Sequence, residues 1–181
     1  REVLPGCRVC GFCHNTDLRQ MKKIPLEREY IRTQIPKLDA IYALHEEQKK
    51  EIMEIYPVEE AKITVVGSGY NASVFHRLNQ SEVSEEKSDK HSYRIIYVGK
   101  IAEKKGVESL VRSLQYLHMN ADELEVDLVG GAGNHEEYQR ILRLAEESRY
   151  PVHLLGRLSQ TDLVASYNRS DLFVLASYSE G

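Results

Sequence analysis

The chain has 181 residues, of which 41% are hydrophobic and 29% are charged, and its net charge at pH 7 is −4. These values are ordinary for a globular protein with a buried core, and the acidic balance gives no support to a nucleic-acid partner. No apolar run approaches the length of a transmembrane segment, and nothing at the N-terminus resembles a signal peptide. Because the chain opens without Met and stops just beyond a predicted strand, we expect a segment of a longer protein.

The first predicted strand, Val9 to Cys13, lies among three cysteines, which are Cys7, Cys10 and Cys13. Cys10 to His14 matches the C-x-x-C-H pattern of covalent haem attachment, and three cysteines could also ligate a metal or a cluster. Alternation along a strand would put Cys10 on the face opposite to Cys7 and Cys13, which disfavours a cluster. An odd number of cysteines without an export signal fits a reducing compartment. We therefore interpret them as small buried residues that pack a strand.

A polar turn, His14-Asn15-Thr16-Asp17, leaves the end of this strand. A His and an Asp three residues apart could form a helix cap with a solvated ring. They could equally be polar groups at the mouth of a cleft. The spacing alone does not decide between these two interpretations.

The rest of the first half alternates helices and strands. The pattern predicts helices over residues 26–35 and 45–56, each followed by proline, and strands over 40–44 and 63–66. The glycine-rich turn Gly67-Ser68-Gly69 lacks a third glycine and a following helix, so we expect it only to supply a positive φ where the chain leaves the sheet. Residues 79–92 are polar and mixed in charge, which is typical of a linker or surface loop. We therefore predict domains over 1–78 and 93–181.

The most informative stretch is Arg94–Gly106. Ile95–Val98 is predicted to be a buried strand, and a helix with an apolar face begins after Lys105-Gly106. Lys100 and Lys105 thus flank a strand-to-helix turn. In open α/β sheets this is the carboxyl edge of the strands, where ligands bind.

The same unit repeats downstream, with strands predicted over 124–129, 152–155 and 171–175 and helices over 135–147 and 161–166. This alternation predicts right-handed crossovers and a parallel sheet. Gly130, Arg157 and Glu180 then follow successive strands, so with Lys100 they should share one edge. The glycines either let a ligand approach the backbone or serve tight packing. Arg157 is either a surface cation or a contact for a diphosphate or a base.

These segments, in this order, resemble the retaining glycosyltransferases of the GT-B class, family 4 (group 1). The matching motifs are Gly99-Lys100, Lys105-Gly106, Gly130-Gly131-Ala132-Gly133, Gly156-Arg157-Leu158 and Ser177-Tyr178-Ser179-Glu180-Gly181. Upstream, His14-Asn15-Thr16-Asp17 is similar to the His-Gly-Thr-Asp turn of the family's acceptor domain. The resemblance implies an α/β fold of GT-B type with parallel Rossmann-like sheets, of which the chain holds the end of the acceptor domain and the first part of the donor domain.

The resemblance also implies roles. Lys100 and Lys105 would hold the donor diphosphate and stabilise the departing phosphate, since fixed cations are worth most in a dry cleft. His14 would reach the donor sugar, and Glu180 would accept hydrogen bonds from its hydroxyls. The remaining donor contacts implied by the motifs are Gly130, Gly131, Arg157, Ser177 and Gly181. Neither a metal nor a cofactor is expected.

The implied donor is a nucleoside-diphosphate sugar such as a UDP- or GDP-sugar, and the acceptor is an unidentified sugar, lipid or small molecule. The implied location is the cytoplasm, with peripheral association at the inner membrane face for the full-length protein. Three departures stand out: Lys100 replaces a common Arg, Asn15 replaces Gly, and the motif's second Glu would lie beyond Gly181. We therefore expect this segment alone to be catalytically incomplete. The alternative hypothesis is a non-catalytic nucleotide-binding α/β module.

Overall fold

The computed structural model describes residues 5–24, 28–79 and 92–178. The chain divides into two compact units, residues 1–70 (unit 1) and residues 71–180 (unit 2). The predicted linker, 79–92, lies outside the described residues except for its two end residues. In the described part of the chain, every helix is too short or too polar to cross a membrane.

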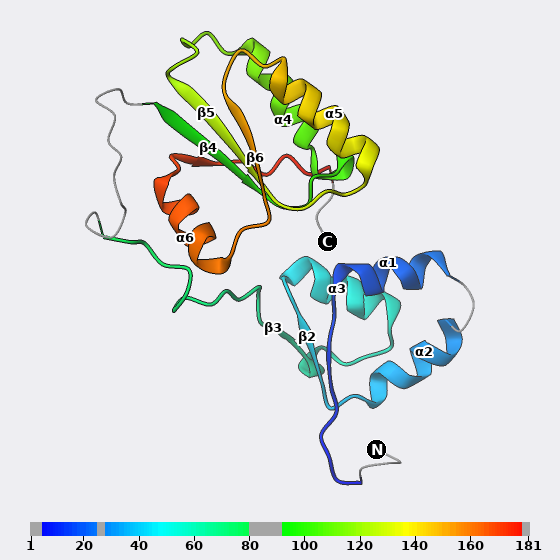
Figure 1. Cartoon of the computed structure of the whole chain (residues 1–181). Helices are drawn as coiled ribbons and strands as arrows, with labels where there is room; N and C mark the ends of the chain where they lie inside the picture. Colours follow the sequence, from blue (N-terminus) through cyan, green and yellow to red (C-terminus); the bar gives the residue numbers. More distant parts are fainter. Residues whose placement is uncertain (1–4, 25–27, 80–91, 179–181) are drawn as a thin grey trace. The chain divides into compact units, whose positions relative to one another are not determined.

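Unit 1 contains a three-stranded parallel sheet in the order β1-β2-β3 (Figure 1). Its strands are β1 (Cys10–Phe12), β2 (Ala40–Ala43) and β3 (Ile63–Val65). Its helices are α1 (Asn15–Lys23), α2 (Arg28–Gln34) and α3 (Glu46–Ile55), with 3-10 turns η1 (Ile35–Lys37) and η2 (Glu60–Lys62). The prediction of alternating strands and helices is confirmed here.

Helix α1 was not predicted from the sequence. It buries only Leu18 and Met21, against Ile41 of β2 and Ile52 of α3. Two apolar residues three apart are too few to produce a visible helical period. The N-terminus of the helix is nevertheless capped, because the carboxylate of Asp17 accepts a hydrogen bond from the backbone N–H of His14 at 2.8 Å. The helix-cap interpretation of this turn therefore describes its local geometry.

The prediction that the cysteines are buried is wrong for two of them. Cys7 and Cys10 are exposed and Cys13 is half-buried, all three as free thiols. Cys7 precedes the short strand β1, and β1 pairs only with β2 among the described strands, so neither residue is covered. Burial raises the pKa of the Cys13 thiol to about 11, and the nearby carboxylates of Asp17 and Glu51 add to this effect.

Unit 2 contains a four-stranded parallel sheet in the order β6-β5-β4-β7. Its strands are β4 (Tyr93–Val98), β5 (Leu124–Val129), β6 (Val152–Gly156) and β7 (Leu172–Phe173). Its helices are α4 (Val107–Ser113), α5 (His135–Glu146) and α6 (Gln160–Arg169), with 3-10 turns η3 (Glu103–Lys105) and η4 (Leu114–Tyr116). The predicted parallel sheet is confirmed, although the last strand is shorter than the predicted 171–175.

Helices α4 and α5 lie together over one face of this sheet, and α6 lies on its other side (Figure 1). The core between the sheet and the helix pair joins Tyr97 of β4 and Val126 of β5 to Val107 of α4 and Ile141 of α5. β5 lies between two neighbours, and the four residues from Val126 to Val129 are all buried. A central parallel strand is covered on both faces, so its residues are buried on both sides, and here they include the polar Asp127.

Candidate functional site

The strand order of unit 2 reverses at β4. The chain moves from β4 to β5 and then β6 on one side, and it returns to place β7 on the other side of β4. In open parallel sheets such a reversal leaves a crevice outside the carboxyl ends of the two strands, and ligands bind there. The residues that follow these strands are Gly99-Lys100 after β4 and Ala176-Ser177 shortly after β7.

A buried residue of the core fixes the backbone of Lys100. The ring of Tyr97 is completely buried, and its hydroxyl donates a hydrogen bond to the backbone carbonyl of Lys100 at 2.9 Å. The backbone N–H of Gly99 donates to the carbonyl of Val129 at 2.9 Å. The lysine backbone is therefore fixed to the sheet while its side chain is exposed.

The glycine-rich loop after β5 extends the pairing of β4 and β5 beyond the sheet. Ile101 N–H donates to the Gly131 carbonyl at 2.9 Å, and Gly133 N–H donates to the Ile101 carbonyl at 2.7 Å. Gly130 has a φ of +145°, and a Cβ there would lie 1.7 Å from the carbonyl oxygen of Gly99. Of the two explanations left open by the sequence, tight backbone packing therefore accounts for Gly130.

Arg157 lies on the β6 side of this loop. A Cβ on Gly131 would meet its Nε at 2.6 Å, so the exposed guanidinium packs directly against the glycine backbone. Arg157 is consequently beside the Gly130-Gly131 turn. In the described structure it does not line the cavity that contains Lys100.

The turn η3 and the segment after β7 are joined by backbone contacts. Gly106 has a φ of +67°, and a Cβ there would lie 1.8 Å from the carbonyl oxygen of Ala176. The N–H of Tyr178 donates to the Lys104 carbonyl at 3.1 Å, and its hydroxyl lies 2.7 Å from that of Ser109. Only glycine fits at position 106 without displacing this segment.

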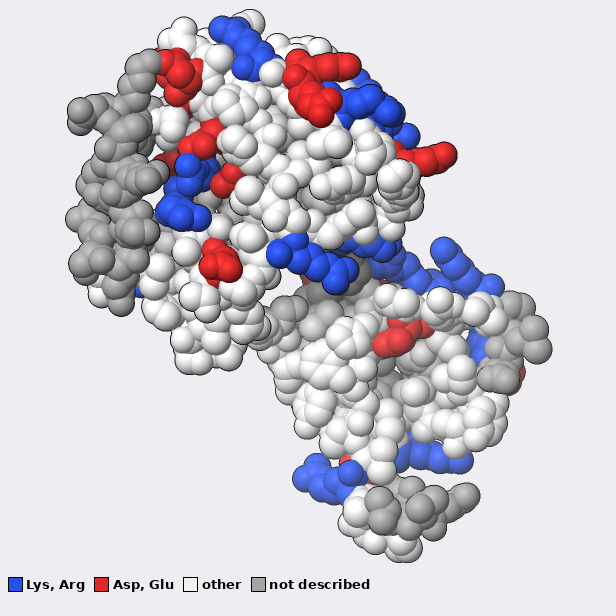
Figure 2. Space-filling model, viewed as in Figure 1, with Lys and Arg blue, Asp and Glu red and all other residues white. Residues whose placement is uncertain are grey.

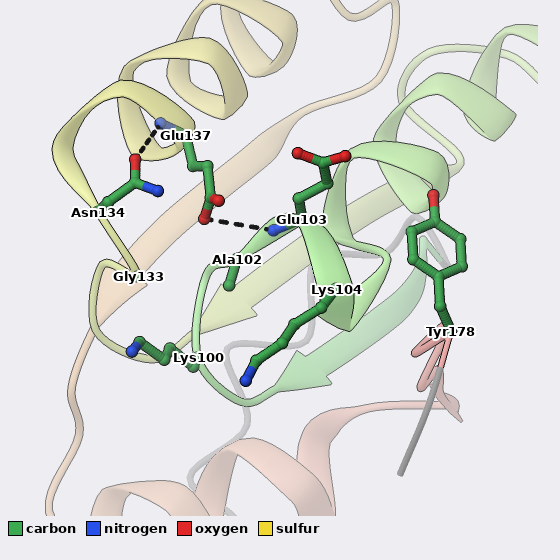
Figure 3. Close-up of a pocket in the computed structure, with 8 residues that line it drawn as sticks. All are labelled: Lys100, Ala102, Glu103, Lys104, Gly133, Asn134, Glu137 and Tyr178. Atoms are coloured by element: carbon green, nitrogen blue, oxygen red, sulfur yellow. Dashed lines mark hydrogen bonds between the residues drawn. The ribbon is translucent and has the colours of Figure 1, made fainter. Parts of the chain in front are cut away.

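A cavity of about 440 Å³ opens at this edge (Figure 3). Its lining residues in the described structure are Lys100, Ala102, Glu103, Lys104, Gly133, Asn134, Glu137 and Tyr178. Two ammonium groups, two carboxylates, an amide and a phenol thus surround one space. Such a polar lining suits a ligand that carries both negative charge and hydroxyl groups.

The two carboxylates of the cavity already have partners. Glu137 Oε2 accepts a hydrogen bond from the backbone N–H of Glu103 at 3.3 Å, and Glu103 Oε2 lies 3.5 Å from the guanidinium of Arg140. Arg140 also pairs with Glu108 at 2.8 Å. The pKa of Glu108 is lowered, chiefly by its hydrogen bond from Arg112. Figure 2 shows the same interspersion of acidic and basic side chains over the visible face of unit 2.

Ser177 adds an unusual feature at the crevice. Its hydroxyl is buried, yet it has no hydrogen-bond partner among the described residues. A buried hydroxyl without a partner costs about 1–3 kcal/mol, so a ligand that bonds to it would recover that loss. The predicted residues Glu180 and Gly181 lie outside the described residues.

Lys105 and His14 complete the predicted set. Lys105 lies in η3, is half-buried and has an interaction partner. His14 belongs to unit 1, where its exposed ring lies 5.1 Å from that of Phe12. Next to it, Asn15 accepts a hydrogen bond at 2.7 Å from the fully buried amide of Gln48, so this departure from the motif has a structural role.

Metal-ligating side chains do not gather in the described residues. No three His, Cys, Asp or Glu side chains among them are grouped so that they could hold a metal ion.

Comparison with known proteins identifies the family. The model for glycosyl transferases group 1 matches residues 77–181, which is more than half of the chain. This chain belongs to that family. A serotype-specific mannosyltransferase, WbdA of Escherichia coli, is 27% identical over 149 residues, which is 79% of this chain and 18% of that protein. An uncharacterized glycosyltransferase of Methanocaldococcus jannaschii is 23% identical, over 80% of this chain and 36% of its own length. The chain thus spans well under half the length of these relatives.

Solved structures of glycosyltransferases share the fold. HepE of Anabaena, determined with UDP and glucose, matches 95% of this chain and 47% of its own, with a TM-score of 0.72 and 12% identity. Sucrose-phosphate synthase of Thermosynechococcus elongatus matches 94% of this chain and 45% of its own, with a TM-score of 0.70 and 17% identity. The predicted GT-B type α/β fold is therefore confirmed.

Several cavity residues were not predicted as site residues from the sequence. They are Ala102, Glu103, Lys104, Gly133, Asn134, Glu137 and Tyr178. Asn134 carried a usable signal, because an Asn just before a helical period is a preferred N-cap. Lys104 carried none that distinguishes it from Lys105, since only the turn geometry decides which of the two lines the cavity.

Proposed function

We propose that the protein transfers a sugar from a nucleoside-diphosphate sugar to an acceptor, with retention of configuration at the sugar. The observation that carries this proposal is the reversal of strand order at β4, which gathers Lys100, the glycine loop and Ser177 at one edge of the sheet. Membership of the glycosyl transferases of group 1 supplies the reaction class. The activity belongs to the full-length protein.

Lys100 and Lys105 would bind the donor diphosphate. Negative charge grows on the leaving group as the sugar departs, and fixed ammonium groups stabilise it more strongly in the transition state than in the ground state. The hydrogen bond from Tyr97 to the Lys100 carbonyl fixes the point at which this side chain leaves the backbone. No metal or cofactor is required in this proposal, since lysine supplies the positive charge.

The other predicted residues would orient the donor. Ser177 would satisfy its buried hydroxyl with a phosphate oxygen, and Arg157 would contact the base or diphosphate beside Gly131. His14 and Glu180 would contact the sugar, and Gly181 would let the backbone approach it. The acceptor is a sugar, lipid or small molecule.

The donor is a UDP- or GDP-sugar. Solved structures of the same fold contain UDP or UDP-glucose, and the relative in Escherichia coli is named a mannosyltransferase. UDP-glucose and GDP-mannose are therefore the first two donors to test. The three free cysteines fit a cytoplasmic location.

Isothermal titration with UDP, GDP and their sugars tests the proposal on the full-length protein. We expect Lys100→Ala to weaken binding of the preferred diphosphate by about 10-fold or more, because an ion pair with a phosphate is lost. If no nucleoside diphosphate binds, or if Lys100→Ala binds like wild type, the proposal is wrong. Binding without hydrolysis or transfer of any donor sugar would favour the non-catalytic module instead. NMR of the anomeric proton of the product then distinguishes retention from inversion.

A further inference from the structure

The cavity beside β4 contains a lysine that the sequence motif does not single out. Lys104 stands next to Lys105, and both belong to the short turn η3. A 3-10 turn has three residues per turn, so successive side chains point about 120° apart. Glu103, Lys104 and Lys105 must therefore point in three different directions.

The structure shows which direction each one takes. The Glu103 carboxylate reaches Arg140, and Lys105 is half-buried with a partner of its own. Lys104 is the lysine of η3 that lines the cavity with Lys100. Figure 3 shows both ammonium groups directed toward the same side of the cavity, opposite to the Tyr178 hydroxyl.

These two ammonium groups are uncompensated in the described structure. Neither Lys100 nor Lys104 forms a hydrogen bond or an ion pair through its side chain with any described residue. The neighbouring carboxylates of Glu103 and Glu137 bond to Arg140 and to a backbone N–H, respectively. Two like charges at one space repel each other unless an anion lies between them.

The backbone of Lys104 is also fixed. Its carbonyl accepts the hydrogen bond from Tyr178 N–H at 3.1 Å, and the adjoining Gly106 packs against Ala176. The turn is therefore anchored to the segment that follows β7, at the place where the strand order reverses. A lysine on an anchored turn loses less freedom on binding than one on a mobile loop.

We propose that Lys104 is a further donor-binding cation, which acts with Lys100 from inside the cavity on the phosphates of the nucleoside-diphosphate donor. This inference rests on the proposed function and adds a residue to it. Lys104 contributes to binding as a point charge, so Arg at this position retains most of the effect and a neutral side chain loses it.

The test compares Lys104→Met and Lys104→Arg with wild type in the full-length protein, using UDP and GDP as probes. The matched control is Arg143→Met, which removes one exposed positive charge from α5 outside the cavity. We expect Lys104→Met to raise the Kd of the diphosphate by about 3- to 10-fold and to reduce its salt dependence. Lys104→Arg should stay within about twofold of wild type, and so should Arg143→Met, whose charge is remote and screened.

Titration of uridine or guanosine, followed by NMR, separates a phosphate contact from a structural effect. We expect nucleoside affinity to be the same in Lys104→Met and wild type. A parallel loss for the nucleoside would overturn the proposal, and so would a Lys104→Met variant that binds diphosphate like the Arg143→Met control. If wild type binds no nucleoside diphosphate, the proposed function itself fails, and that outcome is distinct from both.

Discussion

The loops that follow the strands are held differently in the two units. In unit 2, the loops after β4, β5 and β7 contact one another through backbone atoms, as Gly130 does with Gly99 and Gly106 with Ala176. In unit 1, the loop after β1 passes directly into α1 and is held by the side chain of Asp17. A backbone-packed edge tolerates no added atom, whereas a side-chain cap can be exchanged for another at modest cost. The comparison predicts which substitutions are severe and which are mild.

The largest effect is expected for Gly106→Ala. Gly106 and Gly156 have nearly the same φ, +67° and +68°, in the positive region. A Cβ at Gly156 would meet nothing within 4 Å, whereas one at Gly106 would collide with Ala176. Gly156→Ala should therefore cost about 1 kcal/mol for its backbone strain alone. Gly106→Ala should cost about 3 kcal/mol or more.

Urea unfolding of both variants measures this difference in the free energy of unfolding. Equal losses would mean that the segment after β7 can move away from Gly106 without penalty. The backbone-packed description of this edge would then be incorrect.

A second substitution tests whether the core of unit 2 positions Lys100. Tyr97 and Tyr150 are both almost completely buried, and both hydroxyls donate to backbone carbonyls. Tyr97 bonds to Lys100, whereas Tyr150 bonds to Leu117, away from the cavity. Each Tyr→Phe change should cost about 1–2 kcal/mol because part-buried hydrogen bonds of the hydroxyl are lost, including at Tyr150 one accepted from the N–H of Met119.

Donor binding should separate the two variants. We expect Tyr97→Phe to weaken UDP or GDP binding several-fold and Tyr150→Phe to leave it unchanged, as measured by isothermal titration. If both variants bind alike, the hydrogen bond to the Lys100 carbonyl does not position the lysine.

Sequence patterns were sufficient for the parts of the fold that depend on periodicity. The alternating apolar runs predicted both parallel sheets, and the place of Lys100 after β4 followed from the strand alone. Helix α1 was not predicted because it buries only two residues and its N-cap is His14, and histidine is not among the preferred caps. The exposure of Cys7 and Cys10 depends on which strands lie beside β1, and a single strand's residues do not reveal its neighbours.

The residue types of the candidate site were also predictable from the sequence, whereas the directions of its side chains were not. Its glycines could be located from the sequence, but the reason for Gly130 and Gly106 appears only when Gly99 and Ala176 are seen against them. The choice between Lys104 and Lys105 depends on a rotation of about 120° within a 3-10 turn, which composition and spacing do not encode. A residue's type is thus predictable from a motif, while its direction requires the tertiary structure.

The helix caps provide a milder test of the comparison. The side chain of Asn134 accepts a hydrogen bond from the N–H of Glu137 at 2.8 Å and begins α5. Asn134→Ala should cost about 1 kcal/mol, and Asn134→Ser, which keeps an acceptor, should cost much less. Asp17→Ala in unit 1 should cost about 0.5–1 kcal/mol for the same reason. Chemical unfolding checks all three, and a loss above that of Gly106→Ala for any cap would contradict the proposed ranking.

The smallest effects are expected from two carboxylates of unit 2 whose pKa values shift in opposite directions. Burial raises the pKa of Asp127, which is 7% exposed, and the guanidinium of Arg94 only partly offsets this. The contribution of Asp127 to stability is therefore complete below its ordinary value of 3.8 and is lost as the pH rises through the raised pKa. Asp127→Asn should be slightly more stable than wild type at pH 7, and this gain should shrink as the solution is acidified.

For Glu108 we expect the opposite dependence of stability on pH. Its pKa is lowered, chiefly by the hydrogen bond from Arg112, so its contribution is present above the ordinary value of 4.5 and is lost as the pH falls through the lowered pKa. Glu108→Gln should then be slightly less stable than wild type at pH 7 and equal to it in acid. Thermal unfolding of both variants from pH 7 to a pH well below 4.5 measures how each stability difference changes with pH. If both stability differences change with pH in the same direction, burial does not dominate the pKa of Asp127. Arg94 would then stabilise the Asp127 carboxylate as strongly as Arg112 stabilises that of Glu108.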